Sequence, residues 1–157
     1  MAIGKGRLLA IRRLIPSSPC EPGCTDCCCP VPFSQPEWDR VPEKFKKGLD
    51  IRRTESFFGR TMWLPCKPDF LPKGFGDFIP QRHLSSAMRA GTLDEQKGDC
   101  PFVSQKNGCL IYDERPIICR LYGTSMIFLL RCNRGLTTKS LLTDAEVKDI
   151  TKRWYLL

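Results

Sequence analysis

The stretch CEPGCTDCCC, residues 20–29, contains five of the ten cysteines in this chain of 157 residues. Cysteines so close in sequence pair poorly with one another, because a disulfide needs Cβ atoms that face each other at a Cα separation of about 4.4–6.8 Å. Their thiolates can, however, bind together to one metal ion or one iron–sulfur cluster. The choice between disulfides and metal ligation therefore decides how this chain folds.

Four more cysteines follow in the second half of the chain: Cys100, Cys109, Cys119 and Cys132. The tenth, Cys66, stands alone between the two groups, and a single cysteine of this kind is more often an ordinary buried thiol. Two separate groups predict that the two halves of the chain meet at a shared cysteine metal centre.

The N-terminal segment indicates a compartment in which thiols stay reduced. Residues 1–19 are basic and lack any acidic residue, and their longest uncharged apolar run spans only residues 8–11. A secretory signal needs about 7–15 apolar residues, and a membrane span needs about 20. We therefore expect a cytoplasmic protein without a membrane segment, in which cysteine spacing indicates metal binding or catalysis more often than disulfides.

Two motifs in the second cysteine group are typical of a known family. Cys100-Pro101-Phe102 is followed by CLIYDERPIICR at residues 109–120. With the earlier cysteine run, these motifs resemble the YkgJ-like CxxCxxCC cysteine-cluster family, whose pattern continues with CPF and CxIYxxRPxxCR. The first motif departs from that pattern, because three residues separate Cys20 from Cys24 and because Cys29 is additional. The resemblance covers roughly residues 20–33 and 100–132.

This resemblance implies a zinc- or iron-chelating domain; most members of the family have no assigned reaction, although a flagellin lysine methylase carries a related motif. The predicted metal ligands come from both cysteine groups: Cys24, Cys27, Cys28, Cys100, Cys109, Cys119, Cys20 and Cys132. Eight such residues could also fill two sites of four cysteines each.

The identity of the metal is narrowed by spacing. His83 is the only histidine, which excludes a Cys₂His₂ zinc finger. The second group has spacings of x8, x9 and x12 instead of the paired CxxC knuckles of structural zinc sites. A cubane cluster accepts one tight CxxC group together with remote cysteines. We therefore favour one [4Fe-4S] cluster, with one or two zinc ions as the alternative, and disulfides or unbound thiols as the third possibility.

Arg115 and Arg120 flank Cys119 and are predicted to support the site without binding the metal. A centre with four thiolates carries net negative charge, which guanidinium groups can offset while they donate N–H bonds to sulfur or to nearby carbonyls. Tyr112, in the same motif, is expected in the hydrophobic core.

We predict a single domain over residues 1–157, α+β or mainly helical and rich in loops, organised around the cysteine metal centre. The first helix would bury Leu8, Ile11, Leu14 and Ile15 and end at Pro16. A capping box at residues 34–37 begins a second helix, which Pro42 divides, and another begins the C-terminal helix over residues 143–155. Short strands within residues 56–80 and a short helix over residues 80–90 complete the prediction.

The basic composition allows a second class of function. The formal net charge is +8, which suits nucleic acid, although bound thiolates would lower it and make such a role secondary. The chain contains no P-loop, dinucleotide-binding or zinc-protease motif, so an enzyme, such as a methyl- or electron-transfer partner, is an open but less favoured class. The alternative function is a structural component of a larger assembly with protein partners, such as a virion or ribonucleoprotein particle, stabilised by the metal or by disulfides. The protein would then reside in that particle.

Overall fold

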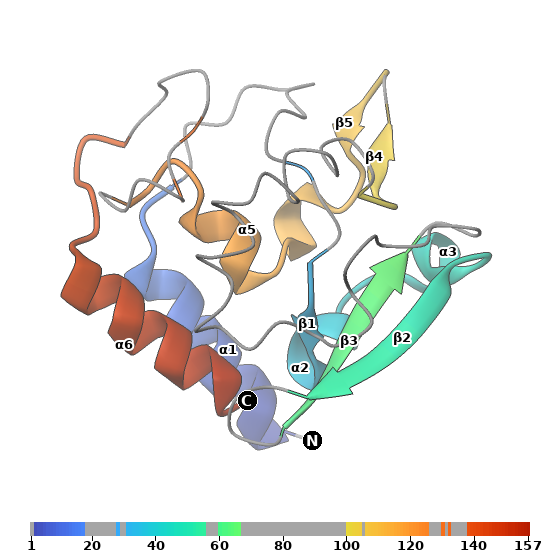
Figure 1. Cartoon of the computed structure of the whole chain (residues 1–157), viewed down its shortest axis with the longest axis horizontal. Helices are drawn as coiled ribbons and strands as arrows, with labels where there is room; N and C mark the ends of the chain where they lie inside the picture. The colour runs from blue at the N-terminus through green and yellow to red at the C-terminus, as the bar shows by residue number, and fades with distance from the viewer. Residues whose placement is uncertain are drawn as a thin grey trace, which may run out of the picture.

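The computed structural model describes residues 2–17, 28, 31–55, 60–66, 100–104, 106–125, 130, 132 and 138–157. In chain order its elements are α1 (Ala2–Leu14), β1 (Phe33–Ser34), α2 (Gln35–Trp38), α3 (Glu43–Lys46), β2 (Asp50–Glu55), β3 (Thr61–Cys66), β4 (Val103–Ser104), β5 (Gly108–Cys109), the 3-10 helix η2 (Tyr112–Glu114), α5 (Ile117–Leu121) and α6 (Asp144–Tyr155). Figure 1 shows α1 and α6 beside each other on one side, the larger sheet on the other, and α5 between them.

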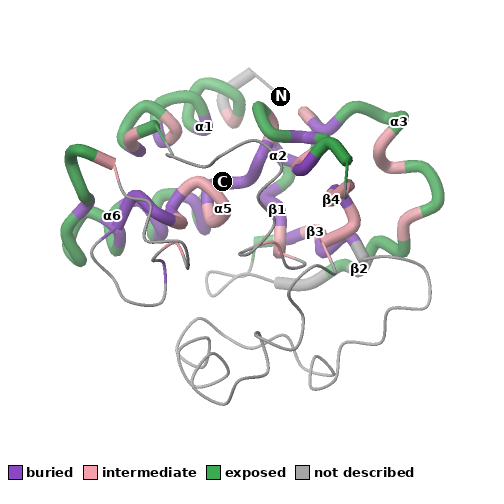
Figure 2. The backbone as a smooth tube through the Cα atoms, turned by 90° about the horizontal axis from the view of Figure 1, so that it is seen from above, coloured by how far each residue is buried: buried purple, intermediate pink, exposed green. Residues whose placement is uncertain are grey.

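The first hydrophobic core forms where α1, α5 and α6 meet. Leu8 and Ile11 of α1 are buried against Trp154 of α6 and against Ile117 of α5. The prediction that Leu14 shares this face is wrong, because its side chain is 46% exposed. At 3.6 residues per turn, Leu14 points about 120° away from Leu8, outside the buried arc. Figure 2 shows the exposed residues of α1 on the outside of the molecule and the buried residues of α5 in its interior.

A three-stranded antiparallel sheet in the order β1-β3-β2 lies between two cores. Met62 of β3 belongs to the first core. The next residue, Trp63, faces the opposite side of the sheet and pairs with Phe33 of β1. Phe33 lies in the second core, where its ring meets those of Trp38 and Phe102 edge-on at centroid distances of 5.6 and 5.8 Å. Successive side chains of β3 point to opposite faces of the sheet, so neighbouring residues enter different cores.

The predicted division of the second helix at Pro42 is confirmed. The chain forms two four-residue helices, α2 and α3, on either side of this proline. Trp38 and Val41 are buried in the second core, and Phe45 packs against it. After α3, Gly48 adopts a φ of +77°, a left-handed conformation that glycine takes without strain as the chain turns into β2.

The structure confirms a small domain of helices and small antiparallel sheets. The predicted strands in residues 56–80 are represented by β3; residues 56–59 and 67–80, together with the helix predicted over residues 80–90, lie outside the described residues. Across the described ranges, every helix is too short or too polar to traverse a lipid bilayer.

Candidate metal centre

Cys100 and Cys109 both lie against the second hydrophobic core. The two-stranded hairpin β4–β5 positions them, because Cys109 pairs with Val103 and the Cys100 carbonyl accepts a hydrogen bond from the Val103 amide at 3.2 Å. Both cysteines are half-buried. Phe102, between them in sequence, is 2% exposed and anchors the hairpin to the core. The structure thus places two predicted ligands, one from each of the two motifs, against the same hydrophobic core.

Cys119 lies in the middle of α5 and is also half-buried. Its neighbours Ile118 and Tyr122 pack against the first core. Ile111, at the beginning of the same motif, is buried in the second core. The segment from residue 109 to residue 119 therefore crosses from one core to the other and carries a cysteine at each end.

The remaining predicted ligands are described in part. Cys28 and Cys132 are half-buried, and Val31, close after Cys28, packs against the second core. Three predicted ligands and one further cysteine lie outside the described residues: Cys20, Cys24, Cys27 and Cys29. Their participation stays a prediction, and so does the exclusion of Cys66.

The donor chemistry fits zinc or iron. The described cysteines offer soft sulfur ligands at half-buried positions, and such ligands suit both zinc and iron–sulfur clusters. Among the described residues, no three Cys, His, Asp or Glu side chains lie close enough together to hold a metal ion. The described residues include five of the eight predicted ligands, Cys28, Cys100, Cys109, Cys119 and Cys132, so the structure does not gather three of these five around one ion; the other three lie outside the described residues.

The two arginines that flank Cys119 donate hydrogen bonds to the backbone of its motif. Arg115 Nε donates to the Tyr112 carbonyl at 3.0 Å, and its guanidinium lies 3.7 Å from the centre of the Tyr112 ring. Arg120 Nε donates to the Arg115 carbonyl at 3.0 Å, and the same side chain also donates to the Asp113 carbonyl. The acceptors of these bonds are backbone carbonyls. The sequence analysis predicted that the two arginines would donate to sulfur or to nearby carbonyls.

An ion cluster gives this turn an excess of positive charge. Glu114 accepts two hydrogen bonds from Arg40, at 2.7 and 3.0 Å, and a longer one from Arg12 of α1 at 3.5 Å. Arg12 also donates to the Asp113 and Arg115 carbonyls. Its Nε atom is buried and has no hydrogen-bond partner among the described residues. Burial, followed by the charge of Arg40, lowers the pKa of the Arg12 guanidinium.

A comparison with protein families gives the same assignment as the motifs. The sequence model of the family named CxxCxxCC, described as "Putative zinc- or iron-chelating domain", matches residues 19–148. The chain belongs to the CxxCxxCC family. Neither the curated proteins nor the solved structures include a match to this chain. For this CxxCxxCC domain, zinc or iron chelation by a cysteine cluster is therefore the family function, and the particular metal is open.

One residue of the CxxCxxCC domain connects three elements in a way that the sequence did not predict. Glu37 is fully buried, and its Oε2 accepts hydrogen bonds from the Ser34 amide and hydroxyl, both at 2.8 Å, and from Trp154 Nε1 at 2.6 Å. Its Oε1 accepts from the Ile117 amide at 2.6 Å. Burial raises the pKa of the Glu37 carboxyl, although the hydrogen bonds oppose that effect. The capping-box pattern predicted the bond to Ser34, but no local signal points to residues 117 and 154.

The prediction that Tyr112 is a core residue is wrong. Its side chain is 40% exposed. One face of its ring is covered by the Arg115 guanidinium instead of by apolar residues. A cation over an aromatic face is stabilising, so the ring is held at the surface by its own motif.

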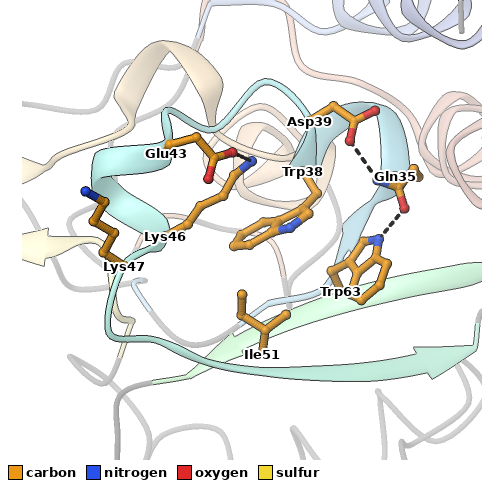
Figure 3. Close-up of a pocket in the computed structure, with 8 residues that line it drawn as sticks. All are labelled: Gln35, Trp38, Asp39, Glu43, Lys46, Lys47, Ile51 and Trp63. Carbon is orange, nitrogen blue, oxygen red and sulfur yellow. Dashed lines mark hydrogen bonds and ion pairs between the residues drawn. The ribbon is translucent and has the colours of Figure 1, made fainter.

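A pocket of about 530 Å³ lies apart from this motif, among α2, α3, β2 and β3 (Figure 3). Its described lining contains no cysteine and combines apolar with charged side chains: Gln35, Trp38, Asp39, Glu43, Lys46, Lys47, Ile51 and Trp63. Several of the polar groups bond to one another. Trp63 Nε1 donates to Gln35 Oε1 at 2.6 Å, and Lys46 Nζ donates to Glu43 at 2.7 Å. The pocket is therefore a separate feature from the predicted metal centre.

Proposed function

We propose that this CxxCxxCC domain holds one [4Fe-4S] cluster through cysteines from both halves of the chain, in a structural or redox role in the reducing cytoplasm. The observation that carries the proposal is the placement of Cys109 and Cys119 at the two ends of one segment, residues 109–119, which runs from the second core to the first. The backbone of this segment accepts a hydrogen bond from Arg120. Cys100, next to Cys109 on the same core, would supply a third sulfur from this half.

The arrangement of the hairpin favours a cluster over zinc. Structural zinc sites commonly use two CxxC-like turns, in which both sulfurs come from one tight knuckle. Here Cys100 precedes β4 and Cys109 ends β5, with eight residues between them in sequence, and Cys119 lies on a helix. Cubane clusters accept such remote cysteines beside one tight CxxC group. That group would come from Cys24 and Cys27.

The charge beside Cys119 supports thiolate ligation. Four arginines surround the turn that precedes this cysteine: Arg12, Arg40, Arg115 and Arg120. Only Glu114 and Asp113 oppose them within the turn itself. Nearby cations stabilise a thiolate relative to a thiol, and they offset the net negative charge of a centre with four cysteine ligands. A bound cubane would supply one-electron transfer, and these arginines would partly offset its negative charge.

Elemental analysis of protein purified without oxygen tests the proposal directly. We expect iron and acid-labile sulfide in equal amounts, together with a brown visible absorption. Stoichiometric zinc in a colourless protein would overturn the iron–sulfur assignment while leaving the cysteine centre in place. Folded protein that binds neither metal would overturn both.

The ligand assignment is tested by Cys119→Ser, with Cys66→Ser as the matched control. Cys119→Ser should lose most of its bound metal and, because metal-binding energy at such sites is folding energy, several kcal/mol of stability. Cys66→Ser, the same chemical change outside the predicted ligands, should keep its metal. Equal metal content in the two variants would contradict the assignment of Cys119.

A further inference from the structure

We infer that Glu37 is a positioning residue of the metal centre: its carboxylate holds the first turn of α5, and therefore Cys119, against α2 and α6. The consequence for metal binding rests on the proposed function. The positioning of α5 rests on the hydrogen-bond geometry alone, so the two can fail separately.

The backbone at the start of α5 requires an acceptor from elsewhere. The first amides of an α-helix have no acceptor within the helix, and a polar side chain at the N-cap usually supplies one. The N-cap of α5 is Pro116, whose side chain carries no hydrogen-bonding atom. Glu37 Oε1, 2.6 Å from the Ile117 amide nitrogen, takes the place of that missing cap from a position 80 residues earlier in the chain.

The other oxygen of Glu37 connects this cap to two further elements. Oε2 accepts from the Ser34 amide and hydroxyl at the start of α2, and from Trp154 Nε1 on α6. Trp154 is 1% exposed and Ile117 is fully buried, so little water can compete for these bonds. Burial of a carboxylate is costly unless donors surround it. Here the donors come from three elements, which fixes the position of α5 relative to α2 and α6.

Cys119 lies two residues beyond Ile117 in the same five-residue helix. A helix this short has few internal hydrogen bonds, so its orientation depends on its external contacts. The bond from Ile117 to Glu37 is the described contact that caps it. Loss of that bond should displace Cys119, just as the loss of groups that orient metal ligands elsewhere costs about 10–100-fold in metal affinity.

The variant Glu37→Gln isolates this effect. It keeps the size of the side chain but has only one oxygen. Because three donors face the position of Oε2 and one faces Oε1, the single oxygen of the glutamine side chain should face Ser34 and Trp154. Its NH₂ group then meets the Ile117 N–H, two donors face each other, and α5 loses its cap. Glu146→Gln is the matched control, because it makes the same chemical change in the exposed capping box of α6, where the carboxylate accepts hydrogen bonds from the Thr143 amide and hydroxyl.

The metal dissociation constant, from chelator competition with zinc or iron at a temperature where circular dichroism shows both variants folded, should rise about 10–100-fold in Glu37→Gln. It should change at most a few-fold in Glu146→Gln. Equal affinities in wild type and Glu37→Gln would overturn the link from Glu37 to the metal.

Amide hydrogen exchange of the wild-type protein gives a test that needs neither metal nor a folded variant. The Ile117 amide should be strongly protected, although it begins a helix, because Glu37 accepts its hydrogen bond. Exchange at the rate of an unprotected amide would overturn the positioning. A wild type that binds no metal but protects Ile117 would overturn the proposed function and leave the positioning of α5 standing.

Discussion

Arg115 makes two different interactions with the same residue of the cysteine motif. Its Nε bonds to the Tyr112 carbonyl, and its guanidinium plane covers the Tyr112 ring at 3.7 Å. A lysine would keep the charge but could not reproduce both, because an ammonium lacks the planar array of donors. The requirement here is for the geometry of an arginine as well as for its charge.

Arg115→Lys should therefore destabilise the protein by about 1–2 kcal/mol, from the lost hydrogen bond and the weaker contact with the ring. Urea unfolding measures this change. Arg53→Lys, at an exposed position on β2, is the control and should have almost no effect. If the two substitutions cost the same, the contact between Arg115 and Tyr112 does not stabilise the turn.

At the scale of elements, α6 shows how local chemistry begins a helix. The Thr143 amide donates to Glu146 Oε2 at 2.7 Å, and the Glu146 amide donates to Thr143 Oγ1 at 3.3 Å. This reciprocal capping box was predicted from the sequence and is confirmed. The buried face of the helix, including Val147, Ile150 and Trp154, then completes the first core.

Removal of this cap gives a prediction with a pH signature. Thr143→Ala should cost about 1 kcal/mol in thermal or urea unfolding. The hydrogen bonds from the Thr143 backbone and side chain lower the pKa of the Glu146 carboxyl. A lowered pKa means that the stabilisation is complete above the ordinary value of 4.5 and is lost as the pH falls through the folded-state value.

Glu146→Gln should therefore be less stable than wild type at neutral and alkaline pH, and it should lose less stability as the pH falls through the acidic range, so that the two stabilities converge in acid. Stability measured across the acidic range, with Glu43→Gln on α3 as a control for a carboxylate outside the box, checks this. The same acid-side slope in wild type and Glu146→Gln would contradict it.

At the scale of the whole molecule, we expect the two cores to depend differently on a bound metal. The first core is closed by α1 and α6 and by the bond from Trp154 to Glu37. The second core is covered by the hairpin β4–β5, whose strands have only two residues each. So short a hairpin is marginally stable by itself. Ligation of Cys100 and Cys109 would supply the constraint that it lacks.

Removal of the metal by a chelator should therefore loosen the hairpin more than the helices. In hydrogen exchange, residues 103–109 should lose protection while α6 keeps most of its own, and the thermal transition should move to a lower temperature. Protein kept with its metal under the same conditions is the control. A uniform loss of protection in both cores, or no loss at all, would contradict this division.

Much of the local structure could be predicted from the sequence. The helix at the N-terminus, the break at Pro42 and both capping boxes depend on residues a few positions apart, whose interactions are set by backbone geometry. The cysteine motifs likewise give the family, since they are read directly from residue spacing.

Local sequence patterns were sufficient to predict the first and last helices, the break at Pro42 and the sulfur atoms available for a metal, but they did not predict β2, the hairpin β4–β5 or α5. Only the tertiary structure decided that Glu37 binds Ile117 and Trp154, which lie 80 and 117 residues away. The exposure of Leu14 and Tyr112 also belongs to the folded molecule: Leu14 points away from the buried face of α1, and the Arg115 guanidinium covers one face of the Tyr112 ring. Local patterns limit what a segment can do, but contacts between remote segments exist only after the chain has folded, because burial and partner choice are properties of the assembled core.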